Sequence, residues 1–334
     1  MQPFRFVVDA SWPGGGLPGP SALGIRTPAS VRRQRAGAEP GVGAAWTELA
    51  RRAEALGYAA LYMPDHLGRQ LSPISALTAA AMATTTLRVG PYVLANDYRH
   101  PLLVARELAT LDVLSGGRVE VGLGAGWRVD DYHQLGLPYD APGRRIDRLE
   151  ESIQLIKRLL EGDTVTHAGP HYRLDRARLD PRPIQRPRPP IVMGGGGPRM
   201  LRLAAREADI VGFIPQFDTH GRPIVSQATE SATAAKAELV RAAAGARWDQ
   251  LVIDINVADA AIVGSGAGPV ASLLAAAKAS AVALIGTPYV LYGTLPRLRQ
   301  LLERRRDRSN ISQYTIGAHA MEAMAQLVEL LAGR

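Results

Sequence analysis

Apolar runs typical of buried strands alternate with helical patterns along nearly the whole chain, and this alternation restricts the fold most. The strand-like runs cover residues 4–8, 58–63, 87–94, 118–123, 191–193, 210–213, 251–257 and 312–316. Helical patterns lie between them, for example over 144–160, where apolar side chains recur every three or four positions. Such alternation is typical of parallel β/α units. Eight units without an obvious linker favour one closed (β/α)8 TIM barrel over a doubly wound sheet.

Two segments interrupt this repeat. Residues 10–43, after the first strand, are crowded with Gly and Pro, and we predict a lid or substrate wall there, because long irregular loops in compact domains are usually functional or disordered. Residues 164–190 are rich in Pro and Arg and contain no long periodic run, which predicts an insertion that crosses the surface. A length of 334 residues suits one barrel domain over 1–334 with such insertions.

Composition excludes several kinds of chemistry. The chain has no cysteine, which excludes disulfides, thiolate catalysis and metals held by Cys, and no metal site is expected. The formal charge of +8 comes almost entirely from arginine, with Lys157, Lys236 and Lys278 the only lysines. The densest basic run, 304–308, falls at the end of a predicted helix, where cations are favourable in any case. We therefore expect attraction of acidic small molecules and no nucleic-acid partner.

The apolar segments are too short for a membrane span. No apolar run approaches the roughly 18 residues that a spanning helix needs. The N-terminal residues lead directly into a strand, without the basic flank and apolar core of a signal peptide. These features predict a soluble, cytoplasmic protein without a membrane partner.

A run of four glycines follows the strand-like residues 191–193 and opens a helix. Glycine leaves backbone N–H groups uncovered by any Cβ, and the helix beginning near Pro198 directs its positive end toward them. A flexible connection is the alternative, and a P-loop is excluded because no Gly-Lys-Ser/Thr follows. We predict a cradle for the phosphate of a cofactor, formed by Gly194, Gly195, Gly196 and Gly197.

Chemically useful side chains follow the second predicted strand. In a TIM barrel, functional groups lie on the loops at the carboxyl ends of the strands. The second strand ends in Pro64-Asp65-His66, and we predict that His66 and Asp65 are catalytic, because histidine is the natural proton donor near neutral pH. The alternative is a structural histidine that pairs with Asp65 or caps the next helix.

The third and fourth predicted strands end in different chemistry. The third mixes an aromatic residue, Tyr92, with the polar pair 96–97, which ordinary turn chemistry also explains. The fourth ends in Gly124-Ala125-Gly126-Trp127. Small residues there would let a flat ring approach the backbone, with Trp127 as a wall; a core position for Trp127 is the alternative. This stretch lacks the helix and distal acid of a dinucleotide fingerprint.

At these positions the chain resembles the luciferase-like monooxygenase superfamily, and more specifically its deazaflavin (coenzyme F420)-dependent oxidoreductase branch. The matching stretches cover 46–67, 87–127, 144–160, 194–213 and the end from Pro288. Together they leave out mainly the loop at 10–43. The set is specific, although no single stretch is.

The resemblance implies a TIM barrel that holds an isoalloxazine-like ring at its mouth, with the phosphate on Gly195, Gly196 and Gly197. It implies a non-proline cis peptide behind the ring, between Tyr92 and Val93. His66 matches the proposed active-site histidine of the deazaflavin enzymes. The remaining cofactor contacts that it implies are Asn96, Gly124, Ala125, Gly126 and Gly194. It also implies a homodimer.

Two features depart from the family pattern. The sugar-phosphate dehydrogenase members carry a Glu where this chain has Trp127, so their acid–base assignment and their substrate do not transfer directly. The long loop at 10–43, which contains Trp12, is also unusual for the family. We expect substrate contacts from Trp12, Trp127 and Tyr132.

Three functions are compatible with these residues. The leading prediction is hydride transfer between the deazaflavin and an organic substrate, such as an unsaturated C=C or C=N bond of a secondary metabolite, with His66 supplying or taking the proton. An FMN-dependent monooxygenase would use the same cradle and barrel. A non-catalytic flavin-binding barrel, with a structural His66, is the third.

Overall fold

Nine parallel strands form the sheet at the centre of the structure. The computed structural model describes residues 1–10, 41–68, 70–216, 223–263 and 284–334. The strands are β1 (Arg5–Asp9), β2 (Ala60–Met63), β3 (Arg88–Pro91), β4 (Leu94–Ala95), β5 (Val121–Gly124), β8 (Ile191–Gly195), β9 (Ile210–Phe213), β10 (Val252–Val257) and β13 (Ile311–Gly317). Their order in the sheet is β3-β2-β1-β13-β10-β9-β8-β5-β4.

The sheet is a nearly closed barrel. A parallel bridge between Val89 and Val119 joins β3 to the residues just before β5, while β4 pairs with β5 itself. Only residues 92–93 separate β3 from β4, so the two occupy a single position of the barrel. The predicted TIM barrel is confirmed.

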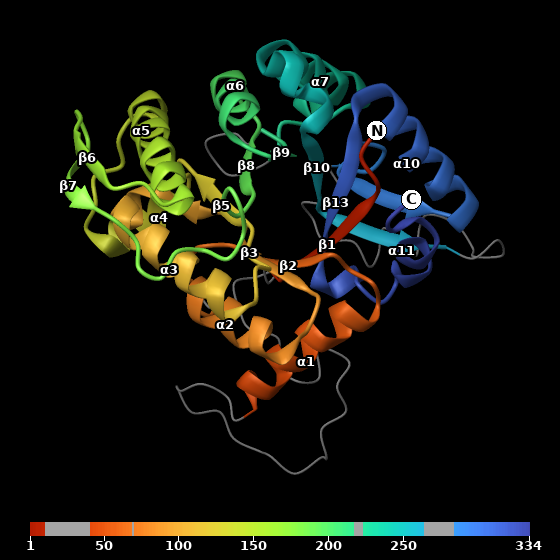
Figure 1. The fold of residues 1–334 in the computed structure, drawn as a ribbon. Helices are drawn as coiled ribbons and strands as arrows, with labels where there is room; N and C mark the ends of the chain where they lie inside the picture. Colours follow the sequence, from red (N-terminus) through yellow and green to blue (C-terminus); the bar gives the residue numbers. More distant parts are fainter. Residues whose placement is uncertain (11–40, 69, 217–222, 264–283) are drawn as a thin grey trace.

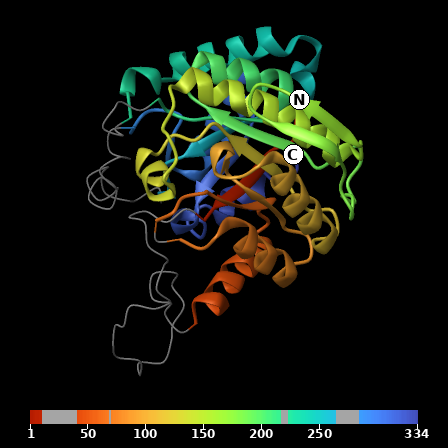
Figure 2. The ribbon, with the colours of Figure 1, turned by 90° about the vertical axis from the view of Figure 1, so that its left-hand side faces the viewer.

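Helices surround these strands (Figure 1). They are α1 (Val42–Ala55), α2 (Pro73–Ala83), α3 (Pro101–Leu114), α4 (Val129–Leu135), α5 (Pro142–Glu161), α6 (Pro198–Glu207), α7 (Glu230–Ala244), α10 (Leu295–Ser309) and α11 (Ala325–Leu331), with 3-10 turns η1 (Asn96–Tyr98), η2 (Val225–Gln227), η3 (Gly245–Gln250) and η4 (Ala318–Ala320). In the second view, α5, α6 and α7 cover one side of the strands and α1 and α2 the other (Figure 2).

Helix α1 shows how the apolar pattern fixes the packing. Its buried residues Trp46, Leu49 and Ala53 recur at helical spacing. The indole N–H of Trp46 donates to the carbonyl of Ala76 in α2, at 2.7 Å, so this large side chain is buried with its polar atom satisfied. The helix begins at Val42, inside the segment 10–43 that the sequence analysis assigns to the lid. The predicted lid at 10–43 is therefore shorter, and residues 11–40, with Trp12, lie outside the described residues.

Short elements account for most differences from the sequence analysis. The segment 164–190 contains an antiparallel hairpin, β6 (Val165–Ala168) and β7 (Arg173–Ala177). A parallel pair, β11 (Asp259–Ile262) and β12 (Val290–Gly293), lies outside the barrel. At the C-terminal end, η4 and a turn precede the short helix α11. Elements of four or five residues contain too few repeats of the apolar pattern to be recognised from the sequence.

The barrel interior combines aromatic packing with buried charge. The rings of Tyr62 and Tyr92 stack with centroids 5.1 Å apart. Glu120 accepts hydrogen bonds from Arg5 Nη2 at 2.6 Å and Arg88 Nε at 2.7 Å, and from the Tyr62 hydroxyl. Burial alone would raise the pKa of Glu120, but the two guanidinium groups hold it below its ordinary value. The buried carboxylate is thus paired, as burial of a charge requires.

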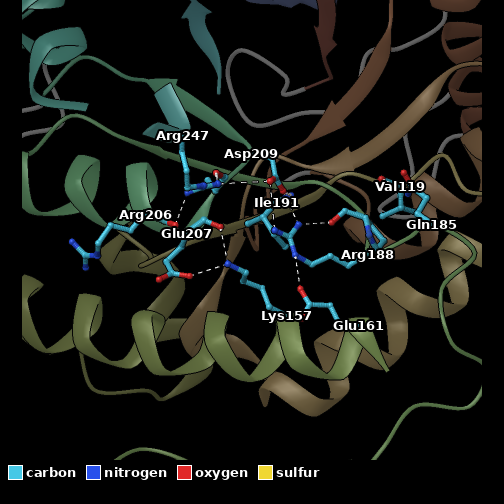
Figure 3. Close-up of polar contacts among 12 residues, drawn as sticks. Val119, Lys157, Glu161, Gln185, Arg188, Ile191, Arg206, Glu207, Asp209 and Arg247 are labelled. Atoms are coloured by element: carbon cyan, nitrogen blue, oxygen red, sulfur yellow. Dashed lines mark hydrogen bonds and ion pairs between the residues drawn. The ribbon is translucent and has the colours of Figure 1, made fainter. Parts of the chain in front are cut away.

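Ion pairs tie together the amino ends of β8 and β9 (Figure 3). Asp209 accepts from Arg188 Nη1 at 2.6 Å and from the backbone N–H of Ile191 at 2.7 Å. Arg188 also lies 3.3 Å from Glu161 of α5, and Arg247 lies 3.9 Å from Asp209. Groups at this end of a TIM barrel generally serve stability rather than catalysis.

We predict that Asp209→Ala lowers the free energy of unfolding by about 1–3 kcal/mol, because it leaves the Ile191 N–H and the Arg188 guanidinium without their acceptor. Urea unfolding measures this loss. Asp163→Ala, which removes an ion pair about half exposed on both sides, is the control and should cost less than about 1 kcal/mol. Equal losses in the two variants would contradict the proposed role of Asp209.

Candidate active site

The loops at the carboxyl ends of the barrel strands gather the residues singled out by the sequence. Residues 64–67 follow β2, residues 125–128 follow β5, and Gly196 and Gly197 follow β8. The β5–β8 pairing aligns Gly122 with Val192. The ends of β5 and β8 therefore lie side by side at the same end of the barrel.

His66 is held by a partner distant in sequence. Its Nδ1 lies 2.7 Å from Asp131 Oδ2, and the Asp131 side chain is only 1% exposed while that of His66 is 23% exposed. Asp131 Oδ1 also accepts from the backbone N–H of Leu67, at 3.3 Å. The imidazole thus lies at the barrel mouth with one nitrogen engaged. The partner is Asp131 of α4, and not Asp65, the local partner considered from the sequence.

Asp65 faces the other way and forms a buried ion pair. Both its oxygens accept from Arg99, at 2.6 and 3.1 Å, and Oδ2 also accepts from the Ala95 backbone N–H, at 3.1 Å. The residue is 4% exposed. Asp65 therefore ties the loop after β2 to β4, in an arrangement that leaves it little access to a substrate.

Trp127 lies at the surface beside His66. Its side chain is 62% exposed, and its ring meets the imidazole edge to face, with centroids 5.5 Å apart. Two side chains hold the backbone of this loop: Tyr139 OH donates to the Trp127 carbonyl at 2.9 Å, and Arg145 donates to the carbonyl of Gly126. The indole is thus exposed at the mouth and is not a core side chain.

Tyr132 supports the same loop from within the protein. Its hydroxyl lies 2.9 Å from Asp97 Oδ2 and 3.3 Å from the Ala125 carbonyl, and the residue has no exposed surface. Gly126 has a φ of +73°, and a Cβ there would collide with the Tyr132 hydroxyl. In this conformation Tyr132 is buried packing beneath the loop and does not offer the substrate contact that we expected.

The turn between β3 and β4 has the geometry implied by the resemblance. The peptide bond between Tyr92 and Val93 is cis. A Cβ at Gly124 would lie 2.5 Å from Val93 Cγ2, so the glycine lets this turn rest on β5. Asn96 follows in η1, is buried, and donates through Nδ2 to the Tyr172 hydroxyl at 2.9 Å.

The glycine run joins β8 to the start of α6. Gly197 is the N-cap, no side chain caps this end, and the first turn contains no acidic residue. The first N–H groups of a helix have no intrahelical acceptor. A Cβ at Gly197 would meet nothing within 4 Å, whereas one at Gly195 would press on Met200. The site therefore fits an anionic group, with Gly197 facing open space and Gly195 tightly packed.

The amino-acid sequence matches a known protein family. The model of the luciferase-like monooxygenase family matches residues 24–322. The chain belongs to this family.

Several members are similar to parts of it. The chain is 32% identical over 157 residues to the 5,10-methylenetetrahydromethanopterin reductase of Archaeoglobus fulgidus, covering 47% of this chain and 45% of that protein. It is 35% identical over 175 residues to the F420-dependent glucose-6-phosphate dehydrogenase of Nakamurella multipartita, covering 50% of each. The matched region thus spans about half the length of these curated relatives.

Likeness to a solved structure extends over the whole chain. The coenzyme F420-dependent tetrahydromethanopterin reductase of Methanopyrus kandleri superposes with a TM-score of 0.71 over 98% of this chain and 99% of that one. The identity is 19%, so this match supports the shared fold.

Sequence reasoning missed three residues at the mouth and inside the barrel. These are Asp131, Arg99 and Asp254, which bond to His66, Asp65 and Tyr92 respectively. The only local signal was the acidic pair 130–131 at the start of a helix, which is also ordinary for helix starts.

The described residues contain neither a metal-binding cluster nor a membrane-spanning helix. No cluster of three or more His, Asp or Glu side chains there is arranged to hold a metal ion. No helix in those same ranges combines the length and the apolar character that crossing a membrane requires.

Asp254 of β10 supports the β3–β4 turn from inside the barrel. It is fully buried and accepts from Tyr92 OH at 2.7 Å and Thr315 Oγ1 at 2.8 Å. Burial raises the pKa of Asp254 to about 7, although these hydrogen bonds act in the opposite direction. The folded-state pKa is thus above the ordinary value of 3.8.

This raised pKa predicts a pH-dependent stability. The contribution of the protonated carboxyl is fully present below about pH 4 and is lost as the pH rises through about 7. Asp254→Asn cannot ionise, so its unfolding free energy relative to the wild type should improve from about pH 4 to 7, by a few kcal/mol at most. Urea unfolding across this range measures the change. Asp249→Asn, at an exposed position, is the control, and a pH-independent difference for Asp254→Asn would contradict the assignment.

Proposed function

We propose that this protein is a deazaflavin (coenzyme F420)-dependent oxidoreductase that moves a hydride between the cofactor and an organic substrate. The observation that carries the proposal is the partly exposed His66 imidazole, at the carboxyl end of β2 and fixed by Asp131. It lies in a barrel of the family whose members include the F420-dependent relatives described above.

The cofactor would lie along the carboxyl ends of β4, β5 and β8. Gly195, Gly196, Gly197 and the start of α6 would bind the phosphate, since this helix end is uncapped and has no acid in its first turn. The residues that would line the ring are Tyr92, Val93, Asn96, Gly124, Ala125, Gly126 and Gly194. Tyr92 and Asn96 are buried, and Tyr92 would act through the backbone of its turn.

The chain's own side chains would serve orientation and proton transfer. When bound, the deazaflavin supplies the hydride chemistry at its ring. His66 would give or take the accompanying proton, and Asp65, which is paired with Arg99, would keep the loop of His66 in place. Trp127 would form an apolar wall for a flat, unsaturated C=C or C=N substrate.

An FMN-dependent monooxygenase is the second candidate, and membership of the luciferase-like monooxygenase family favours it. It would use the same barrel and the same glycine cradle. The two functions differ in oxygen reactivity, because FMN would supply chemistry with O2 and the deazaflavin would supply hydride transfer.

Parallel fluorescence titrations with F420 and FMN test the cofactor. We expect micromolar or tighter binding of F420 and weaker binding of FMN, and the reverse order would favour the monooxygenase. Gly197→Asp adds a carboxylate where a Cβ has room, and should weaken F420 binding roughly tenfold or more relative to Gly197→Asn. Asp and Asn are both good N-cap residues, so the difference between the two variants measures the effect of the negative charge alone. Equal F420 binding by the two variants would contradict the assignment of the phosphate to this cradle.

The acid–base role of His66 requires turnover. With reduced F420 and a panel of α,β-unsaturated carbonyl compounds and imines, His66→Gln should lower kcat at least about a hundredfold while leaving F420 binding unchanged. His133→Gln, at an exposed position on α4, is the matched control and should behave as the wild type. A His66→Gln variant with the wild-type kcat would instead support a structural histidine.

A further inference from the structure

We propose that Asp131 is a positioning residue, which holds His66 in the tautomer with its proton on Nδ1 and so leaves Nε2 to exchange the proton with the substrate. The inference rests on the proposed function of this site. The tautomer itself, however, can be measured without cofactor or substrate.

The surroundings of Asp131 make it an acceptor. Leu67 donates its backbone N–H to Oδ1 at 3.3 Å, the Tyr98 hydroxyl lies 3.4 Å from Oδ2, and Arg128 Nε lies 3.9 Å from Oδ1. Burial, and next the charge of Asp131, raise the pKa of Tyr98, which keeps that hydroxyl protonated and able to donate. The groups around this buried carboxylate are all hydrogen-bond donors, so its oxygens serve as acceptors.

Because Asp131 is a hydrogen-bond acceptor, the ring nitrogen of His66 that faces it must carry the proton. His66 Nδ1 lies 2.7 Å from Asp131 Oδ2, a distance typical of a strong hydrogen bond to a charged acceptor. Nδ1 must therefore be the donor, and a neutral imidazole then carries its lone pair on Nε2. Within the described chain Nε2 has no hydrogen-bond partner, and the side chain is 23% exposed.

The same short helix places both neighbours of the imidazole. Helix α4 begins directly after the loop of Trp127, and its first turn contains Asp131. Trp127 meets one part of the His66 ring edge to face, while Asp131 engages Nδ1. The acid next to His66 in the chain, Asp65, is engaged by Arg99 and by the Ala95 backbone N–H. Asp131 is thus the acid that directly contacts His66.

The variant Asp131→Asn keeps the size of the side chain and changes only its hydrogen bonding to His66. An asparagine amide can turn its NH2 group toward Nδ1, which then has to accept, and the proton moves to Nε2. In the serine-protease triad, the equivalent Asp-to-Asn change keeps the geometry and costs about 10⁴ in kcat through the wrong tautomer. Here we expect at least about a hundredfold loss in kcat, with KM and the F420 dissociation constant within about threefold of the wild type.

Nitrogen NMR of protein labelled with ¹⁵N-histidine tests the tautomer in the protein without cofactor. The chain has seven histidines, and the signal missing from His66→Gln identifies that of His66. We expect a protonated Nδ1 and an unprotonated Nε2 in the wild type when the imidazole is neutral. Asp131→Asn should shift the proton toward Nε2, and Asp130→Asn, an exposed acid next in the chain, should leave it in place.

The outcomes distinguish the inference from the proposed function. A wild-type His66 with its proton on Nε2, or an Asp131→Asn variant with an unchanged tautomer, would overturn the role of Asp131. The wild-type spectrum decides even if the Asp131→Asn variant does not fold. The expected tautomers together with full activity of His66→Gln would instead leave Asp131 as the positioning residue and remove the acid–base role from His66.

Discussion

The close approach of β3 to the chain entering β5 is the contact on which the candidate site depends. Val89 donates its backbone N–H to the Arg118 carbonyl at 2.9 Å, and Glu120 donates to the Val89 carbonyl at 3.0 Å. Gly122 makes this approach possible, because a Cβ there would overlap the Pro91 carbonyl. Closure at this seam brings the loops after β2, β4 and β5 to one edge, where His66 and Trp127 meet.

The two ends of the barrel use charge differently. At the amino end, carboxylates such as Asp209 are paired with arginines and backbone N–H groups that connect neighbouring elements. At the carboxyl end, the Asp131 carboxylate engages an imidazole that still has exposed surface. Ion pairs of the first kind hold a fold together, whereas the second kind orients a group that can exchange a proton.

The mouth is built in layers from the inside outward. Asp254 and Tyr62 support Tyr92 within the barrel, and the turn of Tyr92 rests on β5. Above this, Tyr132 and Arg145 hold the loop that presents Trp127. Buried, fully hydrogen-bonded groups thus fix the backbone beneath the exposed side chains, which is the arrangement that a preorganised site needs.

Three features could be predicted from the amino-acid sequence alone: the barrel, the glycine run before α6 and the position of His66 at a strand end. Apolar runs alternating with helical periodicity suffice for the first, because burial on both faces of parallel strands leaves a pattern within each segment. The short elements β6, β7, β11 and β12 escaped it, since four or five residues contain too few repeats.

The contacts between distant side chains became visible only in the three-dimensional structure. Asp131 lies 65 positions from His66, and Asp254 lies 162 positions from Tyr92. Local patterns encode which face of an element is buried, but a contact between side chains on different elements depends on strand register and on the course of the loops. For this reason the sequence could name His66 and could not name the carboxylate that orients it.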